Sequence, residues 1–213
     1  NSVITKQCSD DNKIGGGAFG IVYKIKGQYD GDFYAIKQIE NAHQDESIRE
    51  IESLLKVRSE FVVYYYCSWS ADNYLYIQME YCSQSLVNIL NTKPEAFGRQ
   101  PGEPMNSIEF YISCHIFREI CECVQYLHEM NPLIIHRDLK PSNILIAHTV
   151  RNGRFIKLCD FGLATIHLQS MSHSENVGTF RYIAPETYDT RYTEKVDIYS
   201  LGIIAQDVFD VHL

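Results

Sequence analysis

The chain has 213 residues, of which 45% are hydrophobic, and its formal net charge is −8. A chain of this length can form one or two domains with a proper hydrophobic core, and its apolar share argues against intrinsic disorder. The acidic balance argues against a protein that binds nucleic acid mainly through phosphate contacts, although a local basic groove could still bind a protein partner.

The sequence shows no basic-then-apolar leader and no apolar run of about 20 residues, so we expect no membrane segment. The seven cysteines include no Cys-x-x-Cys pair. Cys121 and Cys123 would point to different faces of a helix. We therefore expect no zinc site and reduced thiols, as in a cytoplasmic protein.

The N-terminal part of the chain combines two periodicities. Strand-like alternation occurs at residues 21–25, 33–39, 61–69 and 74–80. A stretch at residues 27–31 with Asp30-Gly31 predicts a hairpin turn between the first two strands. Residues 45–57 instead show the period of an amphipathic helix. These elements predict a small, mostly antiparallel sheet plus one helix.

The rest of the chain is predicted to be mostly helical, which makes the fold class α+β. Residues 91–107 are rich in proline and glycine, and this composition predicts an exposed loop. A long helix is expected at residues 107–128, with Ser107 as its N-cap. Short strands, a polar loop and a final helix that begins near Val196 follow.

Residues 15–20 read Gly-Gly-Gly-Ala-Phe-Gly and lie between two strand-like runs. A Gly-x-Gly-x-x-Gly match is weak evidence by itself, because a glycine-rich hairpin turn has the same composition. A dinucleotide-binding fingerprint should open a helix, which this segment does not do. The context favours a loop that folds over nucleotide phosphates, since glycine lets backbone N–H groups approach the oxygens closely.

Lys37 lies in an otherwise apolar strand. One interpretation is a lysine at a strand edge that reaches solvent. The other is a buried lysine that holds the α- and β-phosphates of ATP, and a buried ammonium has to be paired with an anion. A glutamate of the following helix would position it, and Glu50 is the best candidate, with Glu46 one turn earlier as the alternative.

Residues 136–143 read His-Arg-Asp-Leu-Lys-Pro-Ser-Asn. Phosphoryl transfer needs positioning and charge neutralisation more than covalent help from the protein. Asp138 could orient a substrate hydroxyl and accept its proton, Lys140 could neutralise the transferring phosphoryl group, and Asn143 could bind a metal ion. The alternative for a match of this length is an inactive relative that retains the loop.

Further motifs follow in order along the chain. Residues 160–162 read Asp-Phe-Gly, which supplies a carboxylate for Mg²⁺, and residues 178–179 and 184–186 bracket a segment that would dock a substrate. Together with the glycine loop and the loop at 136–143, these motifs make the chain resemble the protein kinase superfamily over essentially all of its length.

The resemblance implies a two-lobed α+β fold that binds ATP and Mg²⁺ in the cleft between its lobes. The N-lobe would span residues 1–80 and the mostly helical C-lobe residues 81–213, the C-lobe being partial and ending near its central helix. The implied catalytic residues are Lys37, Glu50, Asp138, Lys140 and Asn143. The implied metal ligands are Asn143 and Asp160. ATP would contact Ile14, Gly15, Gly17, Gly20, Val22, Ala35, Lys37, Met79, Glu80, Cys82, Leu145 and Cys159, with Met79 as gatekeeper and residues 80–82 as hinge.

Within the superfamily, Lys140 and Thr179 resemble the serine/threonine branch. In the family an arginine placed like Arg137 often pairs with a phosphorylated activation loop. The candidate phosphate acceptors are Thr165, Ser170, Ser172, Ser174 and Thr179.

A finer similarity points to the stress-responsive kinases of the translation initiation factor 2 alpha subunit, the amino-acid-starvation type in particular. It rests on residues 30–37, 74–82 and 196–204, while residues 71–73 leave no room for the acidic insert that those kinases often carry. It implies that alpha subunit as the protein substrate, and with it translation regulation and stress response. It also implies a cytoplasmic protein without direct nucleic-acid contacts in this segment, and it allows a homodimer.

Two other classes of function stay open. A truncated kinase or pseudokinase could bind a nucleotide or a partner without turnover, although a degenerate member would be expected to lack some of the catalytic residues. A kinase of small metabolites is disfavoured by the Ala-Pro-Glu segment, which serves protein substrates in the family.

Overall fold

The computed structural model describes residues 8–17, 20–40, 44–100, 102–151, 153–166, 180–188 and 192–211. The chain divides into two units, residues 1–82 and 83–213. Among the described residues, the first unit holds an antiparallel sheet and one α-helix, and the second is mostly helical, so the predicted α+β class is confirmed.

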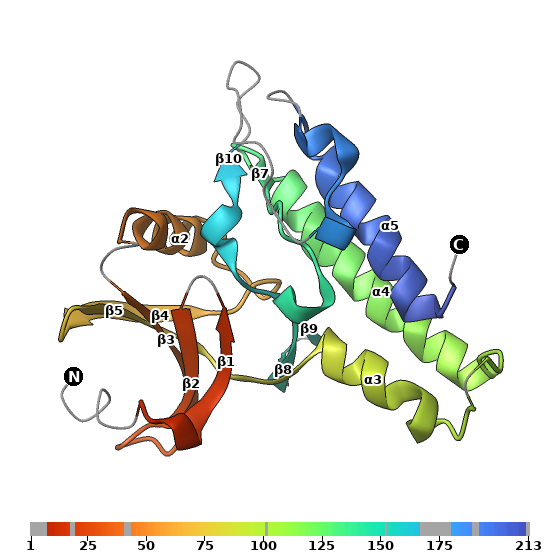
Figure 1. Ribbon diagram of the computed structural model, residues 1–213, viewed down its shortest axis with the longest axis horizontal. Helices are drawn as coiled ribbons and strands as arrows, with labels where there is room; N and C mark the ends of the chain where they lie inside the picture. The colour runs from red at the N-terminus through yellow and green to blue at the C-terminus, as the bar shows by residue number, and fades with distance from the viewer. Residues whose placement is uncertain are drawn as a thin grey trace. The chain divides into compact units, whose positions relative to one another are not determined.

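Unit 1 is built on a five-stranded antiparallel sheet in the order β1-β2-β3-β5-β4 (Figure 1). Its elements are η1 (Asp10–Asn12), β1 (Lys13–Gly17), β2 (Gly20–Lys26), β3 (Phe33–Glu40), α2 (Gln44–Lys56), β4 (Tyr65–Ala71) and β5 (Tyr74–Glu80). The predicted hairpin turn joins β2 to β3, where the N–H of Gly27 donates to the carbonyl of Asp32 at 2.7 Å. The helix predicted after this hairpin is present as α2.

The strand predicted at residues 61–69 begins later, at Tyr65. The N–H of Tyr64 donates to the side chain of Glu80 at 3.2 Å, and the carbonyl of Tyr64 accepts the N–H of Glu80 at 2.8 Å. A carboxylate therefore takes the place of a strand carbonyl at this end. Regular pairing starts only where Tyr65 faces Met79.

The two faces of the sheet carry different side chains, because consecutive residues of a strand point to opposite faces. One face holds a buried cluster of Tyr23, Ile25, Ile36 and Tyr76. The other face holds Lys37, which pairs in register with Val22 on β2 and with Ile77 on β5. Helix α2 packs on β3, β4 and β5 and buries Leu54. An ammonium group is thus held on the face of the sheet that α2 covers.

Unit 2 contains three α-helices among its described residues, α3 (Leu86–Ala96), α4 (Ser107–His128) and α5 (Lys195–Phe209), and α4 and α5 lie side by side (Figure 1). The strands are β6 (Cys82–Ser85), β7 (Ile134–Ile135), β8 (Ile144–Arg151), β9 (Arg154–Leu158) and β10 (Thr165–Ile166). They form one sheet in the order β6-β8-β9 and a pair β10-β7. The described helices include none that is long and apolar enough to cross a membrane.

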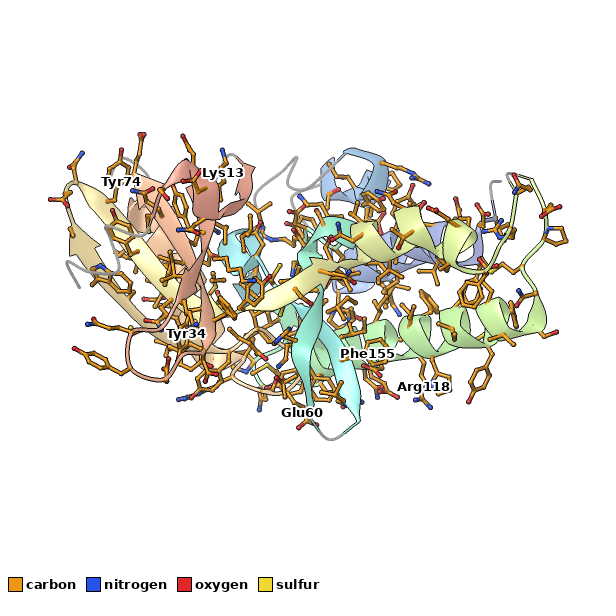
Figure 2. The ribbon with its side chains drawn as sticks, turned by 90° about the horizontal axis from the view of Figure 1, so that it is seen from below. Lys13, Tyr34, Glu60, Tyr74, Arg118 and Phe155 are labelled. Atoms are coloured by element: carbon orange, nitrogen blue, oxygen red, sulfur yellow. The ribbon has the colours of Figure 1, made fainter. Side chains whose placement is uncertain are left out.

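The hairpin of β8 and β9 is attached to α4 through Glu119. This carboxylate is 4% exposed and accepts the backbone N–H groups of Phe155 and Ile156, both at 3.0 Å. Figure 2 shows Phe155 beside α4, whereas Arg118 of the same helix points outward and is largely exposed. The attachment holds the two strands whose ends carry the predicted metal ligands.

The prediction of an exposed loop at residues 91–107 is wrong in its first half, because α3 runs from Leu86 to Ala96 with Pro94 inside its last turn. Local composition favoured a loop, but burial of Leu86 and Lys93 stabilises the helix. The helix starts after Ser85, whose N–H donates to the side chain of Asn88 at 2.8 Å.

The predicted N-cap of the long helix is also wrong by one residue. The cap is Asn106, whose side-chain oxygen accepts the N–H groups of Ile108 at 3.0 Å and Glu109 at 2.9 Å. An asparagine oxygen in this place satisfies two of the N–H groups that a helix start leaves without intrahelical partners.

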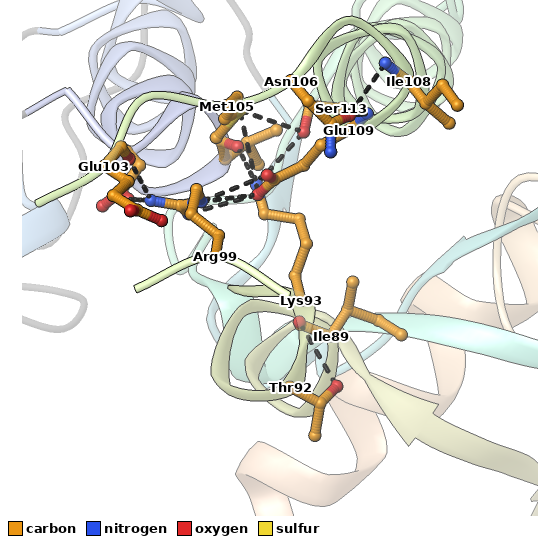
Figure 3. A network of polar contacts seen from close by, with 12 residues as sticks. Ile89, Thr92, Lys93, Arg99, Glu103, Met105, Asn106, Ile108, Glu109 and Ser113 are labelled. Carbon is orange, nitrogen blue, oxygen red and sulfur yellow. Dashed lines mark hydrogen bonds and ion pairs between the residues drawn. The ribbon is translucent and has the colours of Figure 1, made fainter. Parts of the chain in front are cut away.

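A buried polar network joins the three helices of unit 2 (Figure 3). Lys93 of α3 donates to the hydroxyl of Ser113 on α4 at 3.1 Å and to the carbonyl of Val208 on α5 at 2.5 Å. Burial lowers the pKa of Lys93, and the nearby carboxylate of Glu109 acts in the opposite direction. The lysine therefore binds the last turn of α5 to α3 and α4.

Arg99 completes this network from the loop after α3. Its guanidinium lies 3.1 Å from a carboxylate oxygen of Glu109, which is fully buried, and 2.6 Å from a carboxylate oxygen of Asp210 at the end of α5. Two cations and two anions thus neutralise one another; Lys93, Arg99 and Glu109 are buried, whereas the side chain of Asp210 is 39% exposed. Removal of one partner would leave an uncompensated buried charge.

We expect Glu109→Gln to lower the free energy of unfolding by about 3 kcal/mol, because Lys93 and Arg99 lose their shared buried anion. Urea unfolding followed by circular dichroism measures this change. The matched control is Glu95→Gln on α3, where the side chain is exposed, with an expected change within about 0.5 kcal/mol. Equal stability of the two variants would contradict the assignment of this network as a stabilising one.

Candidate active site

The loop at residues 136–143 brings the predicted Asp138, Lys140 and Asn143 together in unit 2. The ammonium of Lys140 lies 2.7 Å from Oδ2 of Asp138, and the side-chain amide of Asn143 donates to the same oxygen at 2.9 Å. That amide also donates to the backbone carbonyl of Asp138 at 2.9 Å. The carboxylate is 4% exposed, so its orientation is set by these contacts and not by solvent.

His136 is the first residue of this loop and is fully buried. Its Nδ1 accepts the N–H of Asp138 at 3.3 Å, so the proton of the neutral ring lies on Nε2, which donates to the carbonyl of Cys159 at 3.0 Å. The ring also contacts Phe161, with a centroid distance of 4.9 Å. The sequence assigned no role to His136, but the structure shows it connecting Asp138 with the segment that carries Asp160.

Asp197 in the first turn of α5 holds the start of the loop. Its two carboxylate oxygens accept the backbone N–H groups of His136 and Arg137, both at 2.9 Å, and the side chain is fully buried. Arg137 has a φ of +69°, a backbone conformation that costs a non-glycine residue roughly 1–2 kcal/mol. The sequence predicted Asp197 only as part of a helix; a carboxylate in an apolar helix was the signal for a further role.

The predicted metal ligands Asn143 and Asp160 lie at neighbouring ends of β8 and β9. Ile144 pairs with Leu158, and the N–H of Cys159 donates to the carbonyl of Asn143 at 3.0 Å. The amide nitrogen of Asn143 faces Asp138, so its Oδ1 is the atom that could bind a cation. Asp160 has a φ of +63°.

These donors fit Mg²⁺. This ion prefers hard oxygen ligands and binds through one or two protein groups together with substrate phosphates and waters. Within the described residues there is no group of three or more His, Cys, Asp or Glu side chains that could hold a metal ion by themselves.

In unit 1, Lys37 and Glu50 form a buried ion pair. The ammonium lies 2.8 and 2.7 Å from the two carboxylate oxygens, and the residues are 6% and 3% exposed. Lys37 thus does not reach solvent from a strand edge, and Glu50 of α2 is its partner. Glu46, the alternative partner, has a side chain outside the described part of the structure.

The residues predicted to enclose adenine in unit 1 lie on one face of the sheet. Val22 pairs with Lys37 and Ala35 pairs with Met79, which places these four on the face that carries the ammonium group. Glu80 ends β5 and Cys82 begins β6. In unit 2, Leu145 lies in β8 and Cys159 directly follows β9.

The glycine loop connects β1 to β2, so the predicted strand-loop-strand context is present. Ile14, Gly15 and Gly17 belong to β1, and Gly20 opens β2, while residues 18 and 19 lie outside the described part. A Cβ at Gly20, with a φ of +118°, would lie 2.3 Å from the carbonyl oxygen of Gln38. A Cβ at Gly15 would meet no atom nearer than 3.9 Å. Packing therefore explains Gly20 but not Gly15, whose open surroundings fit the close approach of a ligand to the backbone.

The predicted docking segment is bound to α5 through Asp207. The hydroxyl of Tyr182 donates to one oxygen of this carboxylate at 2.9 Å, and Arg181 lies 2.7 Å from the other. Burial, together with the hydrogen bond to Asp207, raises the pKa of Tyr182 to about 12. Ser200 of α5 also donates to the carbonyl of Tyr182 at 2.7 Å. The segment η5 (Phe180–Tyr182) is thus fixed by contacts that sequence spacing does not reveal.

Arg137 donates to the carbonyl of Leu163 and, at 2.9 Å, to the hydroxyl of Tyr192. Pairing of this arginine with a phosphorylated loop residue stays a prediction. Of the candidate acceptors, Ser170, Ser172, Ser174 and Thr179 lie outside the described residues, and Thr165 lies in β10. Glu186 lies in η6 (Pro185–Tyr188).

Comparison with known proteins identifies the family of this chain. The family model described as the protein kinase domain matches residues 8–211. The chain is 32% identical to the probable serine/threonine-protein kinase zyg-1 of Caenorhabditis elegans over 90% of its own length and 26% of that protein. It is 30% identical to the mouse interferon-induced, double-stranded RNA-activated protein kinase, over 93% of its own length and 39% of that protein. It is 35% identical to serine/threonine-protein kinase 1 of Arabidopsis thaliana, over 91% of its own length and 22% of that protein.

The chain therefore belongs to the protein kinase family, and two of these relatives are named as serine/threonine kinases. It spans 22% to 39% of the length of these relatives. The motifs that pointed to the superfamily are thus confirmed as marks of family membership.

Substitutions at Gly15 and Gly20 distinguish a glycine needed for ligand binding from one needed for the fold. We expect Gly15→Ala to leave the melting temperature unchanged and to raise the KM for ATP, because the new methyl group has room in the protein but not beneath a phosphate. We expect Gly20→Ala to destabilise the domain by roughly 1–3 kcal/mol, because of its backbone conformation and the nearby carbonyl. Thermal melts and steady-state kinetics measure both. An unstable Gly15→Ala variant, or an unchanged KM, would contradict the phosphate-loop assignment.

Proposed function

We propose that this chain transfers the γ-phosphoryl group of ATP to a serine or threonine hydroxyl of a protein, with Mg²⁺ as cofactor. The observation that carries the proposal is the cluster of the buried Asp138 and Asn143 with the half-buried Lys140, in which one carboxylate oxygen accepts hydrogen bonds from both other side chains. A carboxylate fixed in this way has one defined orientation, as a group that must receive a proton from a bound hydroxyl requires.

Each side chain then has one task. Asp138 orients the substrate hydroxyl and accepts its proton as the oxygen attacks the γ-phosphorus, while the bond from phosphorus to the bridging oxygen breaks and ADP leaves. Lys140 neutralises charge on the transferring group. Asn143 and Asp160 would hold Mg²⁺, which would supply positive charge next to the phosphates of ATP. Lys37, held by Glu50, binds the α- and β-phosphates, and the backbone of the glycine loop approaches them.

The nucleotide base is proposed to bind through the backbone of Glu80 and Cys82. The side chains of Ile14, Val22, Ala35, Met79, Leu145 and Cys159 would enclose it. The register of β2, β3 and β5 supports this proposal, because it aligns Val22, Ala35 and Met79 on the face that carries Lys37.

For the substrate, we propose the alpha subunit of translation initiation factor 2. The support is the similarity of residues 30–37, 74–82 and 196–204 to the kinases of that subunit. The protein would then act in the cytoplasm, in translation regulation under stress, and could work as a homodimer. The relatives are diverse kinases, so this assignment depends on the sequence resemblance and on a direct test.

The test of the enzyme assignment is Asp138→Asn. Asparagine keeps the shape and can still contact Lys140 and Asn143, but it cannot accept the proton. We expect kcat to fall about 10²–10⁴-fold while the KM for ATP changes little. Transfer of labelled phosphate from ATP-Mg²⁺ to protein is the measurement. Equal, negligible transfer by the original chain and the variant, with nucleotide still bound, would support a pseudokinase instead.

The substrate assignment is tested in the same assay with two acceptors. The alpha subunit of the initiation factor should be labelled more efficiently than a generic basic protein, as judged from kcat/KM. Labelling of the generic protein alone would remove the subfamily assignment and leave the kinase activity intact.

A further inference from the structure

Lys24 of β2 lies against two aromatic rings, and the proposed mechanism gives it no role. Its ammonium is 4.1 Å from the ring centroid of Phe33 on β3 and 4.6 Å from that of Tyr81, which directly follows β5. The two ring centroids are 6.0 Å apart, and the ring planes meet at 54°. One cation thus joins two rings that belong to different segments of unit 1.

The strand register places this contact on the face of the sheet that carries the predicted nucleotide-binding side chains. Lys24 pairs with Ala35, and Ala35 pairs in turn with Met79. Phe33 precedes Ala35 by two residues on the same strand and therefore lies on the same face. Tyr81 lies beyond the end of β5, and its contact with Lys24 keeps its ring on this face. The cation and the two rings thus continue the row of side chains predicted to enclose adenine.

Tyr81 is the middle residue of the predicted hinge, between Glu80 and Cys82. Glu80 is held by two contacts with Tyr64, because its N–H donates to the carbonyl at 2.8 Å and its carboxylate accepts the N–H at 3.2 Å. These contacts fix the chain just before Tyr81, and Lys24 fixes the ring of Tyr81 itself. Together they orient the peptide groups through which the nucleotide base is proposed to bind.

A simpler role for Lys24 is to stabilise the hairpin of β2 and β3 by covering Phe33, which is 41% exposed. Contact with Phe33 alone would fit that role. The second ring, that of Tyr81, belongs to neither strand of the hairpin. Lys24 is also half-buried, whereas Lys26 on the same face of β2 is exposed. Stabilisation of the hairpin therefore does not account for the contact with the hinge.

We propose that Lys24 is a positioning residue for nucleotide binding, which holds Tyr81 by a cation–π contact and so fixes the backbone of the hinge. The face of an aromatic ring attracts a cation, and the attraction grows where water is partly excluded. The inference rests on the proposed function for its effect on ATP. Its effect on the hinge can be measured without nucleotide.

The test compares Lys24→Met with Lys24→Arg. Methionine keeps the length of the side chain but removes its charge, whereas a guanidinium stacks on aromatic rings. In Lys24→Met we expect the Kd and the KM for ATP to rise about 3- to 10-fold at unchanged kcat, because the hinge is loosened while the reacting groups are not. Calorimetric titration with ATP-Mg²⁺ and steady-state kinetics measure these values.

Hydrogen exchange of the Glu80 amide is the readout that needs no nucleotide. In Lys24→Met this amide should exchange about 3- to 10-fold faster, because its hydrogen bond to Tyr64 lies next to the released Tyr81. The amide of Ile77, in the middle of β5, should keep its rate. Lys24→Arg should restore both the Kd for ATP and the exchange of Glu80 to within about twofold of the original chain.

The matched control is Lys26→Met, which removes an exposed lysine from the same face of β2 and should change neither measurement. A double-mutant cycle adds Tyr81→Leu. Once the ring is absent, Lys24→Met should change the Kd for ATP by less than about twofold. Additive losses in the cycle, or no recovery in Lys24→Arg, would overturn the inference.

Unchanged Glu80 exchange in Lys24→Met would also overturn it. A lower melting temperature with an unchanged Kd for ATP would do the same, in favour of a role in the hairpin alone. If the original chain binds no ATP, the proposed function fails, while the exchange of Glu80 still decides whether Lys24 holds the hinge.

Discussion

The buried carboxylate of Asp197 binds two consecutive backbone N–H groups of the catalytic loop, at His136 and Arg137, and so determines the path of the chain into Asp138. Arg137 adopts a left-handed backbone conformation that is unfavourable for its residue type. Such a conformation persists only where surrounding contacts demand it. The loop is therefore held by α5 as well as by its own sequence.

The same principle of paired burial recurs at the other charged groups of the molecule. Lys37 is bound to Glu50, Lys140 to Asp138, and Arg99 to Glu109 and Asp210. Burial of a charge is tolerated only when a partner compensates for the lost hydration. Pairing also restricts each side chain to one geometry. In the first two pairs that restriction serves groups assigned to catalysis, and in the third it serves the packing of α3, α4 and α5.

Much of the fold could be predicted from periodicity. The alternation in β2, β3 and β5 and the helical pattern of α2 and α4 identified these elements within a few residues. Each error in the predicted helix and strand boundaries has an identifiable cause. Helix α3 contains Pro94 and is stabilised by burial, and β4 starts late because the Glu80 side chain occupies the N–H of Tyr64. Asn106, not Ser107, caps α4, because its side chain reaches two N–H groups. The start of β4 and the burial of α3 depend on contacts between distant residues, which no pattern within one segment contains, whereas the cap of α4 is a contact within one segment.

The sequence by itself determined the family and the residue types of the site, because the loop at 136–143, Asp-Phe-Gly at 160–162 and the glycine loop each occupy a short continuous stretch. It also indicated Glu50 as the partner of Lys37, since helical and strand periodicities place each side chain on a face. Only the tertiary structure decided what holds those residues in place. Asp197 and Asp207 act on segments far away in the sequence. Their roles depend on directions and distances of a few ångströms, which arise only when α4, α5 and the loops pack together.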